Sequence, residues 1–252
     1  MKTDAPSASQ TGQLLTLWKD VFGEHNGFWE MFLETAFLPE HCRCMESEGQ
    51  ITAALYWFDC TVETCRLAYV YAVVTHPEYR GQGLCRKLME NTHAHLLSLG
   101  YDGVVLVPEK ESLRQMYGKM GYRDCTQVSE FPATASSSPL PLQSIDADAY
   151  RYLRPALLPA LSALEEPEGI AFLETHMGFW FGPGLLLAAN IKDGTLWCPE
   201  YLGDPVAAPD VLAALNCREG HFRSPGKGTP FAMFLELAEN APVPTHLALC
   251  FD

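Results

Sequence analysis

The segment "THPEYRGQGLCRKLMENTHAHL", residues 75–96, joins an apolar run to a helical pattern through the tetrapeptide "RGQG" at 80–83. The apolar run, residues 65–76, is rich in β-branched and aromatic side chains and predicts a strand. After the glycines, leucines recur at helical spacing until Gly100, which predicts a helix over 84–99. Glycines at the start of a helix cost backbone entropy on folding. Their presence here therefore indicates that the turn has a function.

Three kinds of phosphate-binding turn contain glycines at similar spacing. A Walker loop requires Lys-Ser/Thr after its second glycine, where this chain has Leu84 and Cys85. A dinucleotide fingerprint requires a third glycine, and Lys87 stands close to where it would be. The remaining possibility is a strand, a short turn and a helix whose first amides and dipole attract an anion. In that arrangement, Gly81 and Gly83 would let a pyrophosphate approach the backbone.

Two motifs resemble the signatures of the GNAT superfamily of N-acetyltransferases. The first is "RGQGLC", residues 80–85, which matches the signature Arg/Gln-x-x-Gly-x-Gly/Ala except for Cys85 in its last position. The second is "KESLRQMYGKMGY", residues 110–122, which is similar to the family's later helix and turn, with Lys110 in place of the usual Asn. The close resemblance extends over residues 10–131.

The resemblance implies acetyl-CoA as cosubstrate and direct transfer of its acetyl group to an amine. The strand at 70–75 is expected to diverge from the strand at 103–107, with the pantetheine arm between them. The residues that would bind the cofactor are Val73, Val74, Thr75, Arg80, Gly81, Gln82, Gly83, Leu84 and Cys85. Because Cys85 would lie beside the phosphates, a mechanism through an acyl-cysteine is the weaker interpretation.

Tyr117 matches the family's general acid, which would protonate the departing thiolate. Packing within an amphipathic helix is the alternative role for this side chain. The general base is open among the carboxylates of Asp59, Glu63, Glu109 and Glu111, and a chain of water molecules is a further possibility.

The end of the chain offers one more candidate base. More distantly, the chain resembles acetyltransferases of the enhanced-intracellular-survival type, which have two GNAT domains. That resemblance implies that Asp252, through its terminal carboxylate, is a catalytic base or an anchor for the amine. The alternative is that residues 246–251, which alternate apolar side chains, form a strand that only closes the second domain.

The expected fold class is α/β (α+β type), with a GNAT fold of a mixed central sheet flanked by helices, followed by a second, smaller GNAT-like domain. We expect a catalytic acetyl-CoA-binding domain over 1–131, a Pro- and Ser-rich linker over 132–144 and a degenerate domain over 145–252. The hexapeptide "FLETAF" at 32–37 recurs as "FLETHM" at 172–177, within a matched order of predicted elements, and indicates an internal duplication. The second copy has no counterpart of "RGQG".

The composition limits the classes of partner and cofactor that we expect. A formal net charge of −14 disfavours nucleic acid and is compatible with a small cationic amine. Met1–Gly12 is polar and no window is apolar enough to span a bilayer, so neither a signal peptide nor a membrane partner is expected. The nine scattered cysteines suggest reduced thiols in a cytoplasmic protein, and the pair Cys42-x-Cys44 lacks the partners of a zinc site, so no metal is expected.

The sequence therefore predicts an acetyl-CoA-dependent N-acetyltransferase that acts on a primary amine of a small acceptor. Two alternatives stay open. One is a protein or peptide N-acetyltransferase of the same fold. The other is a non-catalytic sensor that binds acyl-CoA.

Overall fold

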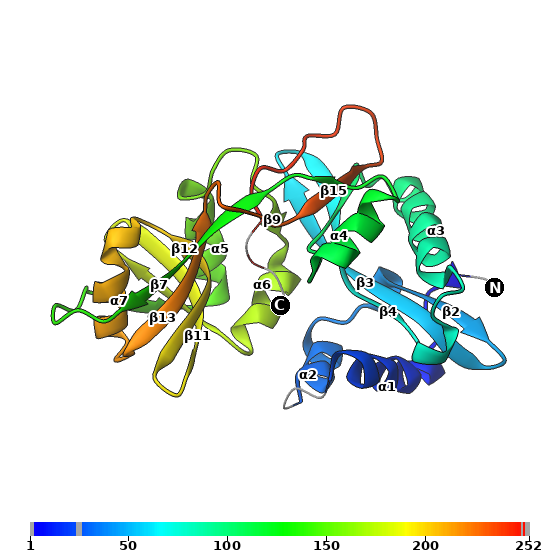
Figure 1. Cartoon of the computed structure of the whole chain (residues 1–252), viewed down its shortest axis with the longest axis horizontal. Coiled ribbons are helices and arrows are strands. Elements are labelled where there is room, and N and C mark those ends of the chain that lie inside the picture. Colours follow the sequence, from blue (N-terminus) through cyan, green and yellow to red (C-terminus); the bar gives the residue numbers. More distant parts are fainter. Residues whose placement is uncertain (1–2, 24–26, 248, 250–252) are drawn as a thin grey trace. The chain divides into compact units, whose positions relative to one another are not determined.

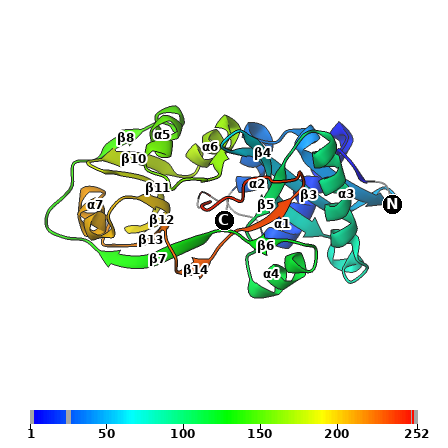
Figure 2. The same ribbon diagram turned by 90° about the horizontal axis from the view of Figure 1, so that it is seen from above.

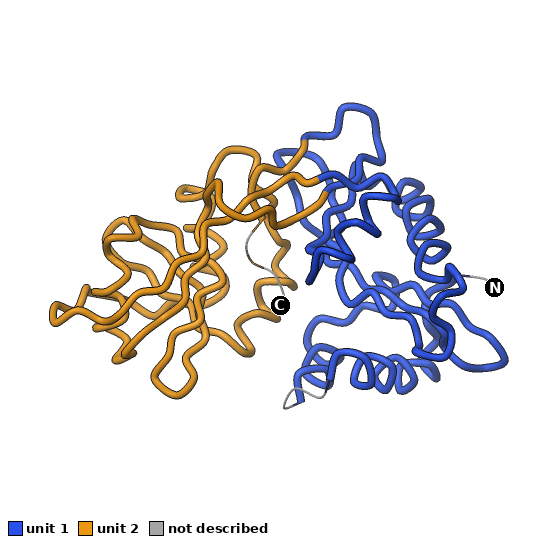
Figure 3. Tube along the Cα trace, viewed as in Figure 1, with its two compact units in different colours: residues 1–123, 234–242 blue, residues 124–233, 243–252 orange. Residues whose placement is uncertain are grey.

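The structure, a computed structural model, describes residues 3–23, 27–247 and 249. The chain forms two compact units, each of which combines segments distant in sequence (Figure 3). Unit 1 comprises residues 1–123 and 234–242, and unit 2 comprises residues 124–233 and 243–252. In the described part, no helix is long and apolar enough to cross a membrane.

Unit 1 is built on a mixed sheet with the strand order β1-β2-β3-β4-β5-β15-β6. Helices α1 and α2 cover one face of this sheet, and α3 and α4 cover the other (Figures 1 and 2). The strands are β1 (Thr3–Asp4), β2 (Cys42–Ser47), β3 (Gln50–Val62), β4 (Cys65–Thr75), β5 (Gly103–Leu106), β6 (Arg123–Asp124) and β15 (Met233–Glu236). The helices are α1 (Thr11–Phe22), α2 (Phe28–Thr35), α3 (Leu84–Ser98) and α4 (Glu111–Gly118), with short 3-10 turns η1 (Ala8–Gln10), η2 (Pro39–His41) and η3 (Pro77–Tyr79).

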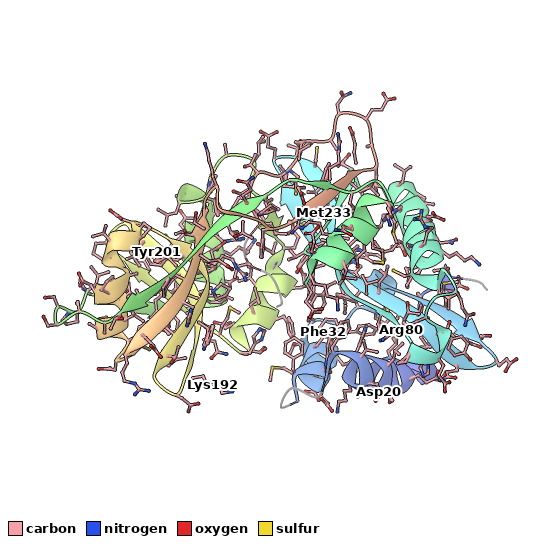
Figure 4. All side chains as sticks on the ribbon, viewed as in Figure 1. Asp20, Phe32, Arg80, Lys192, Tyr201 and Met233 are labelled. Carbon is pink, nitrogen blue, oxygen red and sulfur yellow. The ribbon has the colours of Figure 1, made fainter. Side chains whose placement is uncertain are left out.

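An aromatic layer joins α1 and α2 to the sheet of unit 1. Phe32 of α2 lies fully buried, with ring centroids 4.9 Å from Tyr56 and 6.2 Å from Tyr71 (Figure 4). Trp18 of α1 contacts Phe32 edge-on at 5.6 Å. Because β3 and β4 are covered on both faces, they are apolar almost throughout, as their burial requires.

Unit 2 repeats this architecture with the strand order β8-β10-β11-β12-β13-β7-β14. Helices α5 and α6 cover one face of its sheet and α7 covers the other (Figure 1). The strands are β7 (Gln127–Thr134), β8 (Gln143–Ile145), β10 (Gly178–Gly182), β11 (Leu185–Lys192), β12 (Thr195–Leu202), β13 (Glu219–Pro225) and β14 (Thr229–Pro230), with a short β9 (Leu164–Glu165) outside this order. The helices are α5 (Ala147–Leu153), α6 (Pro167–Glu174) and α7 (Ala208–Ala214), with 3-10 turns η4 (Arg154–Ala156) and η5 (Pro205–Ala207).

The two strand orders match position by position, which fits the predicted internal duplication. In unit 1 the parallel pair β4 and β5 is connected through α3, and in unit 2 the parallel pair β12 and β13 is connected through α7. The repeated hexapeptide lies at the C-terminal end of α2 in the first copy and of α6 in the second. The predicted fold class is confirmed by these two mixed sheets, each flanked by helices.

The boundary between the units does not fall at the expected position, and unit 1 includes a strand from the C-terminal part of the chain. Residues 127–131, which were expected in the first domain, belong to β7, and β7 pairs with β13 in the sheet of unit 2. Strand β15 lies between β5 and β6 in the sheet of unit 1. The division expected at 131, with a linker over 132–144, therefore differs from the observed one. An alternating pattern indicates a strand but not its partner, and Phe131 of β7 finds its partner in Phe222 of β13, at a stacked distance of 5.3 Å.

A buried ionic cluster, formed by Tyr150, Arg154, Glu165, Glu200 and His246, lies in the core of unit 2. The Arg154 guanidinium pairs with Glu165 and with Glu200, at 2.6 Å for Glu200, and all three residues are at most 3% exposed. Tyr150 donates a hydrogen bond to Glu200 at 2.5 Å. Although burial raises the pKa of the Glu200 carboxyl, the opposing charge and hydrogen bonds of Arg154 prevail and hold that pKa at about 2. This cluster contributes to the internal structure of unit 2.

Candidate active site

The turn between β4 and α3 takes a conformation that favours glycine at two positions. Gly81 has φ 76° and Gly83, the N-cap of α3, has φ 75°, and both angles lie in the left-handed region. A Cβ atom built at either position would meet no other heavy atom within 4 Å. The glycines are therefore explained by backbone conformation, with space beside the turn that an approaching ligand could use.

The beginning of α3 offers donors and positive charge. By helix geometry the amides of Leu84, Cys85 and Arg86 lack intrahelical acceptors, and the first intrahelical bond runs from the Lys87 amide to the Gly83 carbonyl at 3.2 Å. The Arg80 side chain, which is labelled in Figure 4, donates from Nε to the Thr75 carbonyl at 3.2 Å and so connects the turn to the end of β4. These first-turn amides and the exposed Arg80, Arg86 and Lys87 fit a pyrophosphate.

The pairing between the parallel strands β4 and β5 ends well before the C-terminal end of β4. Their pairing runs from Leu67 opposite Gly103 to Tyr69 opposite Val105, and within the described residues it goes no further. Beyond that point β4 continues to Thr75 and keeps its pairing with β3, with Val74 opposite Ala54. The other edge of residues 73–75 therefore has backbone groups that β5 does not satisfy. Those groups are the ones expected to pair with the pantetheine arm.

A bulge in β4 was not foreseen from the sequence. The register passes from Tyr71 opposite Tyr56 to Val74 opposite Ala54, so that Ala72 and Val73 both face the single residue Leu55. Ala72 has φ 51°, a left-handed angle that is uncommon for a residue with a side chain. Glycine often occupies this position in a bulge and so marks the bulge in a sequence. Here alanine occupies it, and the sequence contains no such mark.

Tyr117, the predicted general acid, lies on α4 with 6% of its surface exposed. Burial, and secondarily the negative charge that an ionised Cys85 would carry, raise the pKa of its hydroxyl. The group is therefore a neutral proton donor at neutral pH. Its ring lies 5.7 Å from that of Tyr122, and within the described part of the chain its hydroxyl makes no hydrogen bond. A hydroxyl free to donate is what a general acid requires.

Cys85 and His93, both on α3, are partly buried. Burial raises the pKa of the Cys85 thiol, so that it stays protonated at neutral pH and is a poor nucleophile. His93 contacts the Tyr122 hydroxyl through Nε2 at 2.8 Å, and burial lowers its pKa to about 4. A protonated thiol and a histidine with a lowered pKa give neither side chain an evident catalytic role.

The candidate bases do not converge on the turn. Asp59 lies within β3, opposite Ala68 and paired with Arg66 at 3.1 Å. Ala68 precedes the bulge by four residues, or about 13 Å of extended strand. Glu63 and Glu109 are exposed, and Glu111 is exposed and forms an ion pair with Arg114 at 3.8 Å.

The predicted role of Asp252 falls outside the described residues. Nearby, His246 forms an isolated parallel bridge with Ser162, and Leu247 and Leu249 are fully buried. The strand predicted over 246–251 can therefore be compared with the structure only in part.

Comparisons with known proteins agree with this geometry. Residues 4–125 match the family described as the acetyltransferase (GNAT) domain. A GCN5-related N-acetyltransferase from Anabaena variabilis has a similar structure, with TM-score 0.73 at 15% identity over 94% of this chain and 72% of that chain. The structure of Eis1 from Mycobacterium abscessus is also similar, with TM-score 0.68 at 9% identity over 94% of this chain and 74% of that chain. A tandem GNAT protein from the clavulanic acid biosynthesis pathway has TM-score 0.57 at 11% identity over 95% of this chain and 99% of that chain. No curated protein matches the chain significantly.

Residues 4–125 match the acetyltransferase (GNAT) domain family, whose members generally use acetyl-CoA as cosubstrate. The whole chain has the fold of two-domain GNAT proteins, with a second GNAT-like domain after the first.

Proposed function

We propose that this protein is an N-acetyltransferase that transfers the acetyl group of acetyl-CoA directly to a primary amine of a small, cationic acceptor. The observation that carries the proposal is the left-handed glycine turn at the end of β4, which is followed by the first amides of α3 and by the buried, neutral Tyr117. A protein that only bound acyl-CoA would need the turn but no proton donor.

The residues of unit 1 would divide the work. Main-chain donors of Gly81–Cys85, with the positive charge of Arg80, would hold the pyrophosphate. Backbone groups of Val73, Val74 and Thr75 would pair with the pantetheine amides along the open edge of β4. When bound, acetyl-CoA supplies the activated acetyl group. Tyr117 would give its proton to the departing thiolate, and the protonated Cys85 has no covalent role.

The acceptor is proposed from charge and chemistry. A formal net charge of −14 favours a cationic small molecule over a polyanion, because long-range attraction raises the local concentration of an oppositely charged substrate. The alternatives are a protein or peptide amine as acceptor and a sensor that binds acyl-CoA without turnover.

The proposal is tested by incubating the full chain with acetyl-CoA and a panel of amines, with free thiol as the readout and mass spectrometry of the acceptor as confirmation. We expect turnover with small polyamines or amino sugars and one acetyl group gained on an amine. Turnover only with peptides would favour the first alternative. Tight binding of acetyl-CoA without turnover on any amine or peptide would favour the sensor.

The base needs its own experiment, because no carboxylate of the described residues is an evident candidate. We propose Asp252 for this role, and deletion of Phe251 and Asp252 tests it. Lost turnover with preserved acetyl-CoA affinity and melting temperature would support the assignment, whereas full activity would eliminate it.

A further inference from the structure

A buried indole is bound to the backbone of the β4 bulge. Trp18 of α1 donates from Nε1 to the carbonyl oxygen of Ala72 at 3.2 Å, across 54 positions of sequence. Trp18 is 0% exposed, so water does not compete for this donor.

The Ala72 carbonyl needs this donor because the bulge interrupts the strand pairing. Ala72 and Val73 together face Leu55, and a bulge leaves one residue of the longer strand without its regular ladder bonds. The φ angle of 51° at Ala72 is also unfavourable for a residue that has a Cβ atom. A strained backbone of this kind persists only where its surroundings enforce it, and the Trp18 hydrogen bond is such an enforcement.

The orientation of the indole is itself fixed. Trp18 stacks on Trp29 with centroids 5.6 Å apart and an interplanar angle of 19°, and its ring also meets Phe37 edge-on at 6.0 Å. Trp29 in turn donates from Nε1 to the Gly23 carbonyl at 3.0 Å. The aromatic layer of α1 and α2 therefore holds Trp18 in the one orientation that reaches the bulge.

We infer that Trp18 is a positioning residue for acetyl transfer. This inference rests on the proposed function, in which the phosphates bind at 80–85 and the pantetheine arm follows β4 back from Thr75 to Val73. The thioester then comes next in line, at the bulge. By holding the Ala72 carbonyl, Trp18 fixes the plane of the peptide group between Ala72 and Val73, and so the direction of the Val73 amide beside the thioester.

The test compares Trp18→Phe with Trp57→Phe. Trp57 is an equally buried tryptophan of the same unit, and its Nε1 donates to the Tyr101 hydroxyl at 3.1 Å. Both variants lose a buried indole donor, but only one touches the bulge. We expect Trp18→Phe to lower kcat roughly tenfold, the scale of one misplaced hydrogen-bonding group, while the affinity for CoA without its acetyl group stays unchanged. Trp57→Phe should keep kcat.

Two measurements do not depend on turnover. In Trp18→Phe, the affinity ratio between acetyl-CoA and CoA should fall toward one, and the amides of residues 72–75 should exchange with solvent faster than in Trp57→Phe. A benzothienylalanine at position 18, which replaces the indole N–H by sulfur, should reproduce both results if the phenylalanine variant folds poorly. Equal kcat, equal affinity ratio and equal exchange in the two variants would overturn the inference. Absence of turnover in the wild type would instead refute the proposed function, and the two binding and exchange measurements would still decide the role of Trp18.

Discussion

The segment from β4 through its turn to α3 and the segment from β12 through its turn to α7 occupy the same topological position in the two units. In unit 1 the connection contains Gly81 and Gly83 in left-handed conformations, and α3 has 15 residues. In unit 2, α7 has 7 residues, and its N-cap Ala207 has φ −83°. The second copy has kept the strand–helix–strand topology but not the conformation that presents amides to an anion.

Charge separates the two turns further. Arg80, Arg86 and Lys87 surround the first turn, whereas the second has Asp204, whose side chain accepts from the Val206 amide at 2.9 Å, and Asp210 in the first turn of α7. These carboxylates already interact with the amides and the dipole at that end of unit 2. An anion would be repelled there.

The two units also differ at the bulge in the strand that precedes the turn. In β12, Cys198 and Pro199 face the single residue Ala189, at the position that corresponds to the bulge of β4. Neither of them has a positive φ angle, and the next residue is the buried Glu200, where unit 1 has the apolar Val74. The comparison teaches that two units with the same sheet topology differ in the features that we propose bind acetyl-CoA, and that those features occur in unit 1.

The largest effect should come from the glycine that starts α3. Gly83→Leu should lower the affinity for CoA by more than roughly 100-fold, because it obstructs several charge-assisted backbone hydrogen bonds at once. Gly100→Leu is the matched control: Gly100 has φ 81°, equally open surroundings, and lies at the other end of α3. Calorimetric titration should show an unchanged affinity for the control. Equal losses in both variants would mean that backbone strain, rather than ligand contact, explains the glycine.

The next effect concerns the proton donor that we assign to unit 1. Tyr117→Phe should lower kcat by about 100-fold, the scale of one general acid, with little change in CoA affinity or melting temperature. Tyr201→Phe in unit 2 removes a buried hydroxyl that donates to the Asp204 carbonyl at 2.9 Å, and it should leave kcat unchanged. Retention of wild-type kcat in Tyr117→Phe, with chemistry rate-limiting, would make Tyr117 a packing residue.

The units should also differ in acid stability. His93 has a folded pKa of about 4, below its usual 6.5, so its neutral form stabilises unit 1 above pH 6.5 and this contribution disappears as pH falls toward 4. It is on the order of 2 kcal/mol, allowing for partial exposure. Glu200, lowered from 4.5 to about 2, stabilises unit 2 above pH 4.5 and loses this effect only as pH falls toward 2. Hydrogen exchange should therefore show the amides around His93 in α3 losing protection before those around Glu200 in β12. Simultaneous loss at pH 5 would contradict this order.

The smallest effect concerns the acceptor. With a cationic amine, kcat/KM should fall a few-fold as the ionic strength rises to about 0.15 M, because salt screens attraction beyond about 8 Å. An uncharged amine serves as the control and should show no such dependence. If kcat/KM for the cationic amine did not change with ionic strength, the net charge would give no reason to expect a cationic substrate.

Sequence reasoning reached the elements whose signal is local. The helices α3 and α4, the strands β4 and β5 and the glycine turn were predicted, since periodicity, glycine spacing and motifs act over a few residues. The exchange of β7 and β15 was missed because a strand pattern does not identify its partner. The bulge was missed because Ala72, rather than glycine, takes the left-handed angle, and Trp18 because its acceptor lies 54 positions away.

The central claim, that the ligand-binding features lie in unit 1, is tested most directly by the stoichiometry and location of acetyl-CoA binding to the whole chain. Calorimetric titration should give one molecule per chain. Hydrogen exchange with and without ligand should show new protection in residues 73–75 and 80–87 and none in residues 203–210. Two bound molecules per chain, or protection at 203–210, would contradict the account.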